Sequence, residues 1–434
     1  MRRRIERRTL ASHTSHTSHA VAIAVACAFA FAFVLSVGAD SAEAHGLHAH
    51  SHEFVAPLAA ESPVAPEAAP VTAVPDDGAP GGFGRAGLAW LEQARANEAP
   101  HGYSMAESLF TRALALDPTD WTSLIGMGSL ALSRHDFVGA LPWVERARAA
   151  HPISTPLLAN EVDASIELGR YEQARVALEQ MVALRPDLPS LSRVSYLREL
   201  HGDLDGAIDA MERAAEAGVA GSPEAAWCRT HLADLLLRAG RLEDAEGQLR
   251  RVDRERPGDP RALAGLARLS ARRGDVASAQ RLYEAALASY PLAQFRIELG
   301  ELLAAEGRTV EAEAQFELVR AAVADAREHG MDVDLEMVLF ELEHGGDPEQ
   351  LVQIAEQVYA RRPSVTAAHV LAWALFRSGR LPEARARIDD ALQLGGGSDP
   401  LLLRHAGRIL DASGDAAAAA PLLANARALD PRLN

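Results

Sequence analysis

A unit of 34 residues recurs along most of this chain, and no other feature of the sequence constrains the fold as strongly. Prolines close successive units at Pro118, Pro152 and Pro186, a step of 34 residues, and the same step joins Pro257 to Pro291. A second marker is a turn glycine followed five residues later by an alanine. It occurs at Gly169/Ala174, Gly202/Ala207, Gly240/Ala245, Gly274/Ala279, Gly307/Ala312, Gly379/Ala384 and Gly414/Ala419. Self-similarity at this period predicts a solenoid of stacked units.

Each unit has the pattern of two helices joined by a tight turn. In the segment 105–114, apolar residues recur three and four positions apart, which is typical of one face of an α-helix. The glycine can adopt the left-handed conformation that ends the first helix, and the proline stops the second. The alanine then lies where the two helices cross closely. Because one such pair cannot bury its apolar face alone, neighbouring pairs must stack.

This register makes specific predictions about packing. Ala174, Ala245 and Ala279 should each be buried between the two helices of their unit. Longer intervals between the marker alanines place insertions near 218–225 and 325–334. The first insertion contains glycines and a proline and is predicted to be a loop, whereas the second is predicted to lengthen a helix.

The first unit shows the small, aromatic and proline positions most fully, at Trp90, Ala106, Phe110, Ala113 and Pro118. These residues resemble the tetratricopeptide repeat family, and the resemblance covers residues 87 to 434. It implies an all-α, right-handed superhelical solenoid of about ten helix-turn-helix repeats, which we assign to residues 85–434. It also implies a concave groove, lined by the first helix of each unit, in which a protein or peptide partner binds.

The composition excludes several classes of enzyme. The chain contains no lysine, which Walker-type phosphate loops, pyridoxal Schiff bases and Ser-x-x-Lys enzymes all require. It also contains no H-E-x-x-H pattern. The formal net charge of −17 argues against a nucleic acid as the main partner. We therefore expect a non-enzymatic protein without a resident cofactor.

Residues 1–44 have the organisation of a secretory signal peptide. Arginines at the start precede an apolar run from Ala20 to Val37, and Ala42-Glu43-Ala44 supplies a small-residue cleavage site. We expect cleavage before His45 and an exported protein, periplasmic or extracellular. The alternative is an uncleaved membrane anchor at residues 20–37, since about 18 apolar residues can span a bilayer.

Four histidines follow the expected cleavage site, at His45, His48, His50 and His52. Neutral imidazoles bind Cu(II), Ni(II) or Zn(II), and a free α-amine on His45 would add a further copper ligand. Residues 45–52 are therefore a candidate metal site. The other interpretation is a polar tail that has no physiological metal.

Residues 53–84 have the composition of a Pro/Ala-rich disordered linker. At its end, Gly82, Gly84 and Gly87 match the G-x-G-x-x-G pattern of dinucleotide sites. Such a site needs a buried strand before the glycines, and here the preceding segment is rich in proline. We predict that the match has no nucleotide-binding function.

The family resemblance also places partner-binding positions on the first helices. In the eighth to tenth units these positions are rich in aromatic residues and arginines, which carry much of the binding energy at interfaces. They are Glu336, Phe340, Glu343, His344, His369, Trp373, Phe376, Arg377, Arg404, His405 and Arg408. Trp373 and Phe376 have the most weight, because aromatic residues make up only 5% of the chain. We expect both to be exposed in the groove; the alternative is that they pack against a neighbouring helix.

The same positions form a second cluster in the fourth to sixth units. Its members are Arg193, Tyr196, Glu199, Trp227, His231, Asp234, Arg261, Arg268 and Arg272. Three arginines on one helix suggest an acidic peptide or carboxylate ligand, and a solvated arginine face is the alternative. In the third unit, Glu161 occupies a position that the family usually fills with a buried leucine. We expect a local rotation to expose it, because an unpaired buried carboxylate is costly.

The sequence thus predicts a non-enzymatic, extracytoplasmic scaffold that binds a protein partner. The alternative function is that of a periplasmic metal-handling accessory protein that uses the histidines of residues 45–52.

Overall fold

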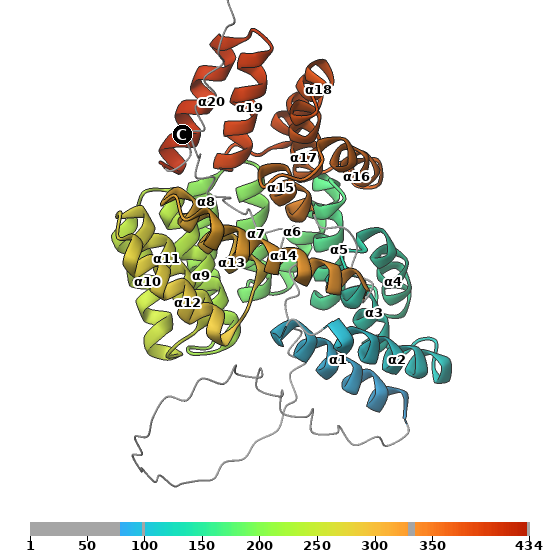
Figure 1. Ribbon diagram of the computed structural model, residues 1–434. Helices are drawn as coiled ribbons and strands as arrows, with labels where there is room; N and C mark the ends of the chain where they lie inside the picture. Colours follow the sequence, from blue (N-terminus) through green and yellow to red (C-terminus); the bar gives the residue numbers. More distant parts are fainter. Residues whose placement is uncertain (1–78, 98–99, 329–334, 432–434) are drawn as a thin grey trace, which may run out of the picture.

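The computed structural model describes residues 79–97, 100–328 and 335–431, which form twenty α-helices and no strand. The helices follow one another in pairs, and each pair is one repeat unit (Figure 1). The pairs are α1 (Pro80–Asn97) and α2 (Pro100–Leu116), α3 (Trp121–Ser133) and α4 (Phe137–Ala150), α5 (Thr155–Glu167) and α6 (Tyr171–Leu184), α7 (Leu188–Leu200) and α8 (Leu204–Ala217), α9 (Pro223–Arg238) and α10 (Leu242–Glu255), α11 (Pro260–Arg272) and α12 (Val276–Ser289), α13 (Ala293–Ala305) and α14 (Thr309–Glu328), α15 (Leu335–Glu343) and α16 (Pro348–Arg361), α17 (Val365–Arg377) and α18 (Leu381–Leu394), and α19 (Pro400–Ala412) and α20 (Ala416–Leu429). The predicted all-α solenoid of about ten repeats is confirmed.

Local chemistry sets where the helices begin and end. At the start of α3 the Asp120 carboxylate accepts a hydrogen bond from the backbone N–H of Ser123 at 2.9 Å, which satisfies one of the free donors of the first turn. At the ends of α5 and α9, Gly169 and Gly240 have φ of 70° and 72°. This left-handed conformation closes the turn between the two helices of a unit, as the sequence predicts.

The packing register is also confirmed. Ala174, Ala245 and Ala279 are all 0% exposed. The first insertion is the loop between α8 and α9, and the second extends α14 to Glu328. The small side chains at the crossings allow the paired helices to approach closely.

The N-terminal boundary of the solenoid differs from the prediction. Helix α1 begins at Pro80 rather than at residue 85, since proline is favoured in the first turn of a helix. The glycines of the G-x-G-x-x-G match lie inside this helix. A Cβ atom on Gly84 would lie 2.9 Å from Asp120 Oδ2, and one on Gly87 would lie 2.5 Å from Phe110 Cε1. These glycines therefore allow α1 to pack closely on α2 and α3.

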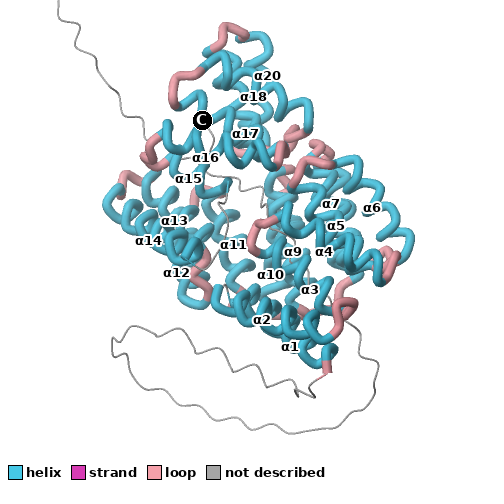
Figure 2. The backbone as a smooth tube through the Cα atoms, turned by 90° about the vertical axis from the view of Figure 1, so that its right-hand side faces the viewer, coloured by secondary structure: helices cyan, strands magenta, loops and turns pink. Residues whose placement is uncertain are grey.

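The superhelix closes on itself, because its C-terminal units pack against its middle units. The backbone N–H of Val365, at the start of α17, donates to Tyr171 Oη at the start of α6, at 2.8 Å. The Gly396 N–H donates to the carbonyl oxygen of Leu200 at 2.6 Å. Ser398 Oγ donates to the Glu199 carbonyl oxygen at 2.7 Å. Figures 1 and 2 show the resulting arrangement, in which the late units lie beside α5 to α7.

None of the helices in the described part of the chain is both long and apolar enough to cross a membrane. The predicted signal peptide, residues 1–44, and the histidines of residues 45–52 lie outside the described residues, as does most of the predicted linker.

Candidate functional site

The odd-numbered helices are the first helices of the units, and we call the surface that they form the inner face. Polar contacts join consecutive helices along it. Arg193 of α7 donates two hydrogen bonds to the Asp163 carboxylate of α5, at 2.8 and 2.7 Å, and both side chains are buried. Glu199 of α7 accepts from Arg238 at 2.6 Å and faces His231 of α9 at 3.3 Å. These contacts pair buried charges and link neighbouring units.

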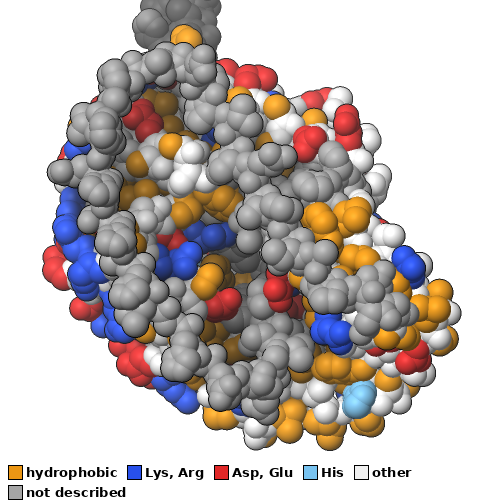
Figure 3. Space-filling view, turned by 90° about the horizontal axis from the view of Figure 1, so that it is seen from below, with side chains coloured by type: hydrophobic (Ala, Val, Ile, Leu, Met, Phe, Trp, Pro, Cys, Tyr) orange, Lys and Arg blue, Asp and Glu red, His pale blue; other side chains and the backbone are white. Residues whose placement is uncertain are grey.

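Two of the arginines of α11, in the sixth unit, are paired in the same way. Arg268 donates to Asp234 at 3.0 Å and to Glu298 at 3.0 Å, so it bridges α9, α11 and α13. Arg272 donates to Asp430, which lies 158 residues away in the sequence, at 3.1 Å. Of the three arginines predicted to bind an acidic peptide or carboxylate, Arg268 and Arg272 are therefore held in internal ion pairs. Figure 3 shows acidic and basic side chains lying close together around the hollow of the molecule.

The other members of this second cluster are partly or fully covered. Tyr196 is buried, and Trp227 is half-buried and stacks on His231 with ring centroids 5.3 Å apart. The guanidinium of Arg261 lies over the Tyr290 ring, 5.2 Å from its centroid.

The predicted residues of the last three units converge on Glu343, at the end of α15. Its carboxylate accepts from Trp373 Nε1 at 2.5 Å and lies 3.4 Å from His405 Nε2. Arg404 and Arg377 are 3.7 and 3.9 Å from the same carboxylate. Burial alone would raise the pKa of Glu343, but the contact with His405 and the two arginine charges outweigh it and lower the pKa to about 2.

Trp373 is not exposed, in contrast to the expectation from the sequence. It is 1% exposed, because the His405 ring stacks on it with centroids 3.6 Å apart and an interplanar angle of 3°. His405 Nδ1 lies 2.9 Å from His369 Nε2, and both histidines are buried. The indole thus belongs to the core of the inner face and links α15, α17 and α19.

The residues of the eighth unit are also more covered than a groove lining would be. Phe340 is 1% exposed and packs edge-on against Phe316. His344 is half-buried, and its Nε2 lies 3.6 Å from Glu301 Oε1. Glu336 is half-buried on α15.

Two arginines form the exposed edge of this region. Arg377 and Arg408 are exposed, and their guanidinium carbons lie 5.9 and 5.6 Å from the Trp373 ring centroid. Phe376 is half-buried and stacks on Trp373 with centroids 5.1 Å apart. We call these eight residues the C-terminal cluster. They are Glu343, His369, Trp373, Phe376, Arg377, Arg404, His405 and Arg408.

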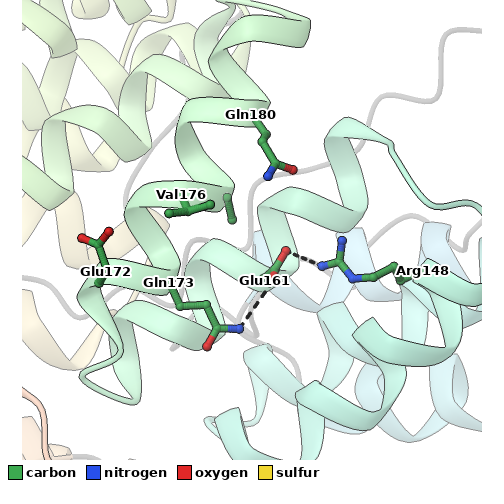
Figure 4. A pocket seen from close by; sticks show the side chains of 7 residues that line it. Arg148, Glu161, Glu172, Gln173, Val176 and Gln180 are labelled. Atoms are coloured by element: carbon green, nitrogen blue, oxygen red, sulfur yellow. Dashed lines mark hydrogen bonds and ion pairs between the residues drawn. The ribbon is translucent and has the colours of Figure 1, made fainter.

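A separate, open recess lies between α4, α5 and α6 (Figure 4). Glu161 lies in it, with its side chain 13% exposed, and forms a salt bridge with Arg148. The expectation that a local rotation exposes Glu161 is therefore wrong, because the ion pair with Arg148 lets the carboxylate remain largely covered. None of the predicted partner-binding residues lines this recess.

No cluster of three or more potential metal ligands occurs within residues 79–97, 100–328 and 335–431. The predicted ligands His45, His48, His50 and His52 lie outside these ranges.

Models of the tetratricopeptide repeat family match residues 200–269, 264–327 and 365–390. Among curated proteins, the chain is 27% identical over 328 residues to "Cellulose synthase 1 operon protein C" of Komagataeibacter xylinus, which covers 73% of this chain and 22% of that protein. It is 28% identical over 314 residues to "Cellulose synthase operon protein C" of Xanthomonas axonopodis pv. citri. This match covers 67% of this chain and 20% of that protein. The chain thus spans about a fifth of the length of these relatives.

Solved repeat structures are similar over part of the chain. A tetratricopeptide repeat protein from Parabacteroides merdae superposes with a TM-score of 0.41 at 17% identity, covering 57% of this chain and 100% of that one. Pseudomonas aeruginosa PilF superposes with a TM-score of 0.38 at 17% identity, and the match covers 51% of this chain and 96% of that one.

Proposed function

We propose that this multi-repeat tetratricopeptide repeat protein is a non-enzymatic scaffold that binds a protein partner at the C-terminal cluster. One observation carries the choice of site. Arginines earlier on the inner face, such as Arg193 and Arg268, are bonded to carboxylates of adjacent units. By contrast, Arg377 and Arg408 are exposed at the edge of this cluster beside the half-buried Phe376, although Arg377 also lies 3.9 Å from Glu343. Arginine and aromatic side chains are enriched among the residues that dominate binding at protein interfaces.

We further propose that the scaffold works outside the cytoplasm. The basic start, apolar run and Ala42-Glu43-Ala44 site support export. The relatives named for a cellulose synthase operon suggest that the partner belongs to an assembly for polysaccharide production. Since the chain covers about a fifth of those relatives, this assignment is to the repeat region and not to their whole activity.

Position-specific cross-linking in the native host tests the proposed site. A photo-reactive residue at Thr366 or Asp411, on the helices that carry Arg377 and Arg408, should capture a partner that mass spectrometry can identify. The matched control is Arg213, an exposed residue on α8. Equal capture at Arg213 and at Thr366 would assign binding to another face or to non-specific contact.

The second candidate function is metal capture by the histidines of residues 45–52. Four imidazoles within eight residues favour it, because adjacent side chains can chelate one Cu(II) or Ni(II) ion. This function could coexist with the scaffold, since the candidate metal ligands and the C-terminal cluster are far apart in the sequence.

A further inference from the structure

We propose that the buried guanidinium of Arg404 is the receptor for a carboxylate of the protein partner, with Arg377 and Arg408 on the exposed edge of the same cluster. This inference rests on the proposed function, because it names the chemical group that the C-terminal cluster recognises.

Arg404 is the most unusual charged residue of the cluster. It is 3% exposed, yet its Nε and Nη1 atoms have no hydrogen-bond partner. Its remaining nitrogen, Nη2, lies 3.7 Å from Glu343, which is beyond hydrogen-bonding distance. A buried cation with unused donors is costly, and burial lowers the pKa of Arg404 accordingly. An anionic ligand would remove that cost.

The neighbouring histidine does not supply the missing partner. His405 Nε2 lies 3.2 Å from Arg404 Nη2 and 3.4 Å from the Glu343 carboxylate. In a neutral imidazole this atom either accepts from Arg404 or donates to Glu343, and it cannot do both. In either case Arg404 keeps at least two guanidinium nitrogens without an acceptor.

The other charged groups around Arg404 are engaged elsewhere. Glu343 is shared among Trp373, His405 and two arginines. Two further carboxylates act on Arg404 through space, Glu301 and Asp430. Glu301 faces His344, and Asp430 accepts a hydrogen bond from Arg272. Two arginines, Arg377 and Arg404, therefore share Glu343, and the positive charge of Arg408 acts on Arg404 as well.

A peptide carboxylate fits this site better than a nucleic acid does. Planar guanidinium groups bind carboxylates through paired hydrogen bonds, and the half-buried Phe376 offers an apolar contact beside them. A long polyanion would instead be repelled by the net charge of −17.

Fluorescence anisotropy with a labelled peptide Gly-Ser-Asp-Glu-Asp-Leu, amidated at its C-terminus, tests the inference on the full chain. The matched probe is Gly-Ser-Asn-Gln-Asn-Leu, which has the same shape and no side-chain carboxylate. We expect the acidic peptide to bind at least about tenfold more tightly, as is usual for charge-assisted hydrogen bonds. Equal binding of the two peptides, or no binding of the acidic one, would overturn the inference. Tighter binding of inorganic phosphate would assign the site to phosphate instead.

Two variants separate recognition from structure. Arg404→Met should abolish the preference for the acidic peptide. The free variant should melt no lower than the wild type, because a buried cation with two unbonded nitrogens is removed. Arg404→Lys keeps one charge without the planar fork and should bind at least about tenfold more weakly. The control Arg213→Gln should bind normally. A lower melting temperature for Arg404→Met, or unchanged peptide binding by both Arg404 variants, would contradict the inference.

The two proposals fail in different ways. If cross-linking from Thr366 captures a partner but the acidic peptide binds no better than its amide, the scaffold function stands and the carboxylate receptor does not. If no partner is captured, but binding of the acidic peptide is lost in the Arg404 variants, the carboxylate receptor is supported and the proposed scaffold function is not.

Discussion

The hydrogen bond from the Val365 N–H to the Tyr171 hydroxyl oxygen, at 2.8 Å, joins two helix pairs that lie 194 residues apart in the chain. It is one of several contacts by which the superhelix closes on itself. Arg238 also reaches the Ser398 carbonyl oxygen, at 3.4 Å, and Arg362 lies over the Phe137 ring. The closure holds the C-terminal units, and with them the C-terminal cluster, against the middle of the chain.

Two turn glycines provide a matched test of this closure. Gly169 and Gly240 have nearly equal positive φ, 70° and 72°. A Cβ atom on Gly169 would lie 2.4 Å from the Pro363 carbonyl oxygen, whereas one on Gly240 meets nothing within 4 Å. Both alanine variants should lose about 1–2 kcal/mol from the left-handed conformation. Gly169→Ala should lose a further ~1–3 kcal/mol from the clash across the closure.

Urea unfolding measures this difference, and small-angle scattering reports whether Gly169→Ala opens the superhelix. Equal losses for the two variants, with unchanged scattering, would mean that the units around Gly169 and Pro363 are separated in solution.

Arg268 is expected to stabilise the fold rather than to bind the partner. Replacing it with Ala leaves Asp234 and Glu298 close together without their shared cation. We expect a loss of about 2–3 kcal/mol, less than for a fully buried pair because Asp234 is 32% exposed. Partner affinity measured on the folded fraction should stay unchanged. A stable variant with impaired binding would return Arg268 to the list of ligand contacts.

Stability should fall on acidification because of the buried histidines. Burial lowers the pKa of His405 to about 4, despite the contact with Glu343, and burial also lowers the pKa of His369. Because the folded pKa lies below the unfolded value of about 6.5, the contribution of the neutral ring is complete above pH 6.5 and is lost as the pH falls towards 4.

For His405 alone this loss amounts to about 3 kcal/mol. Denaturation at pH 7 and pH 4.5 measures it. His405→Phe keeps a ring against Trp373 and should weaken the pH dependence. The exposed control His151→Asn should retain the wild-type dependence. If the free energy of unfolding falls equally between pH 7 and pH 4.5 in all three proteins, the pKa of His405 is not lower in the folded state than in the unfolded state.

The sequence predicted the architecture well and the environment of the site poorly, for a physical reason. Burial of Ala174 follows from a helical period within one unit, so local pattern is sufficient. Burial of Trp373 depends on His405 and Glu343, which come from the next unit and the previous one. The partner of Arg272 is Asp430 at the far end of the chain, brought close only by closure of the superhelix. The periodicity of the sequence places side chains on the inner face. It does not show which of these side chains are buried by residues of neighbouring units.

The histidines of residues 45–52 give a prediction that is independent of the solenoid. If they bind metal, deletion of these residues should abolish tight Cu(II) or Ni(II) binding in calorimetry, because the chain would lose four neighbouring imidazoles. Melting of the repeat region should not change. Retained affinity after the deletion would show that the histidines are not the metal ligands.

The affinity of the cross-linked partner for an Arg377→Ala, Arg408→Ala double variant tests the central claim most directly. Both side chains are exposed, so the free energy of unfolding should change by less than about 1 kcal/mol in total. Titration calorimetry with the purified partner should show affinity weakened by at least about 2 kcal/mol, or roughly 30-fold. The Arg213→Gln control should bind like the wild type. Wild-type affinity in the double variant would contradict the account, and would place the partner on a surface other than the C-terminal cluster.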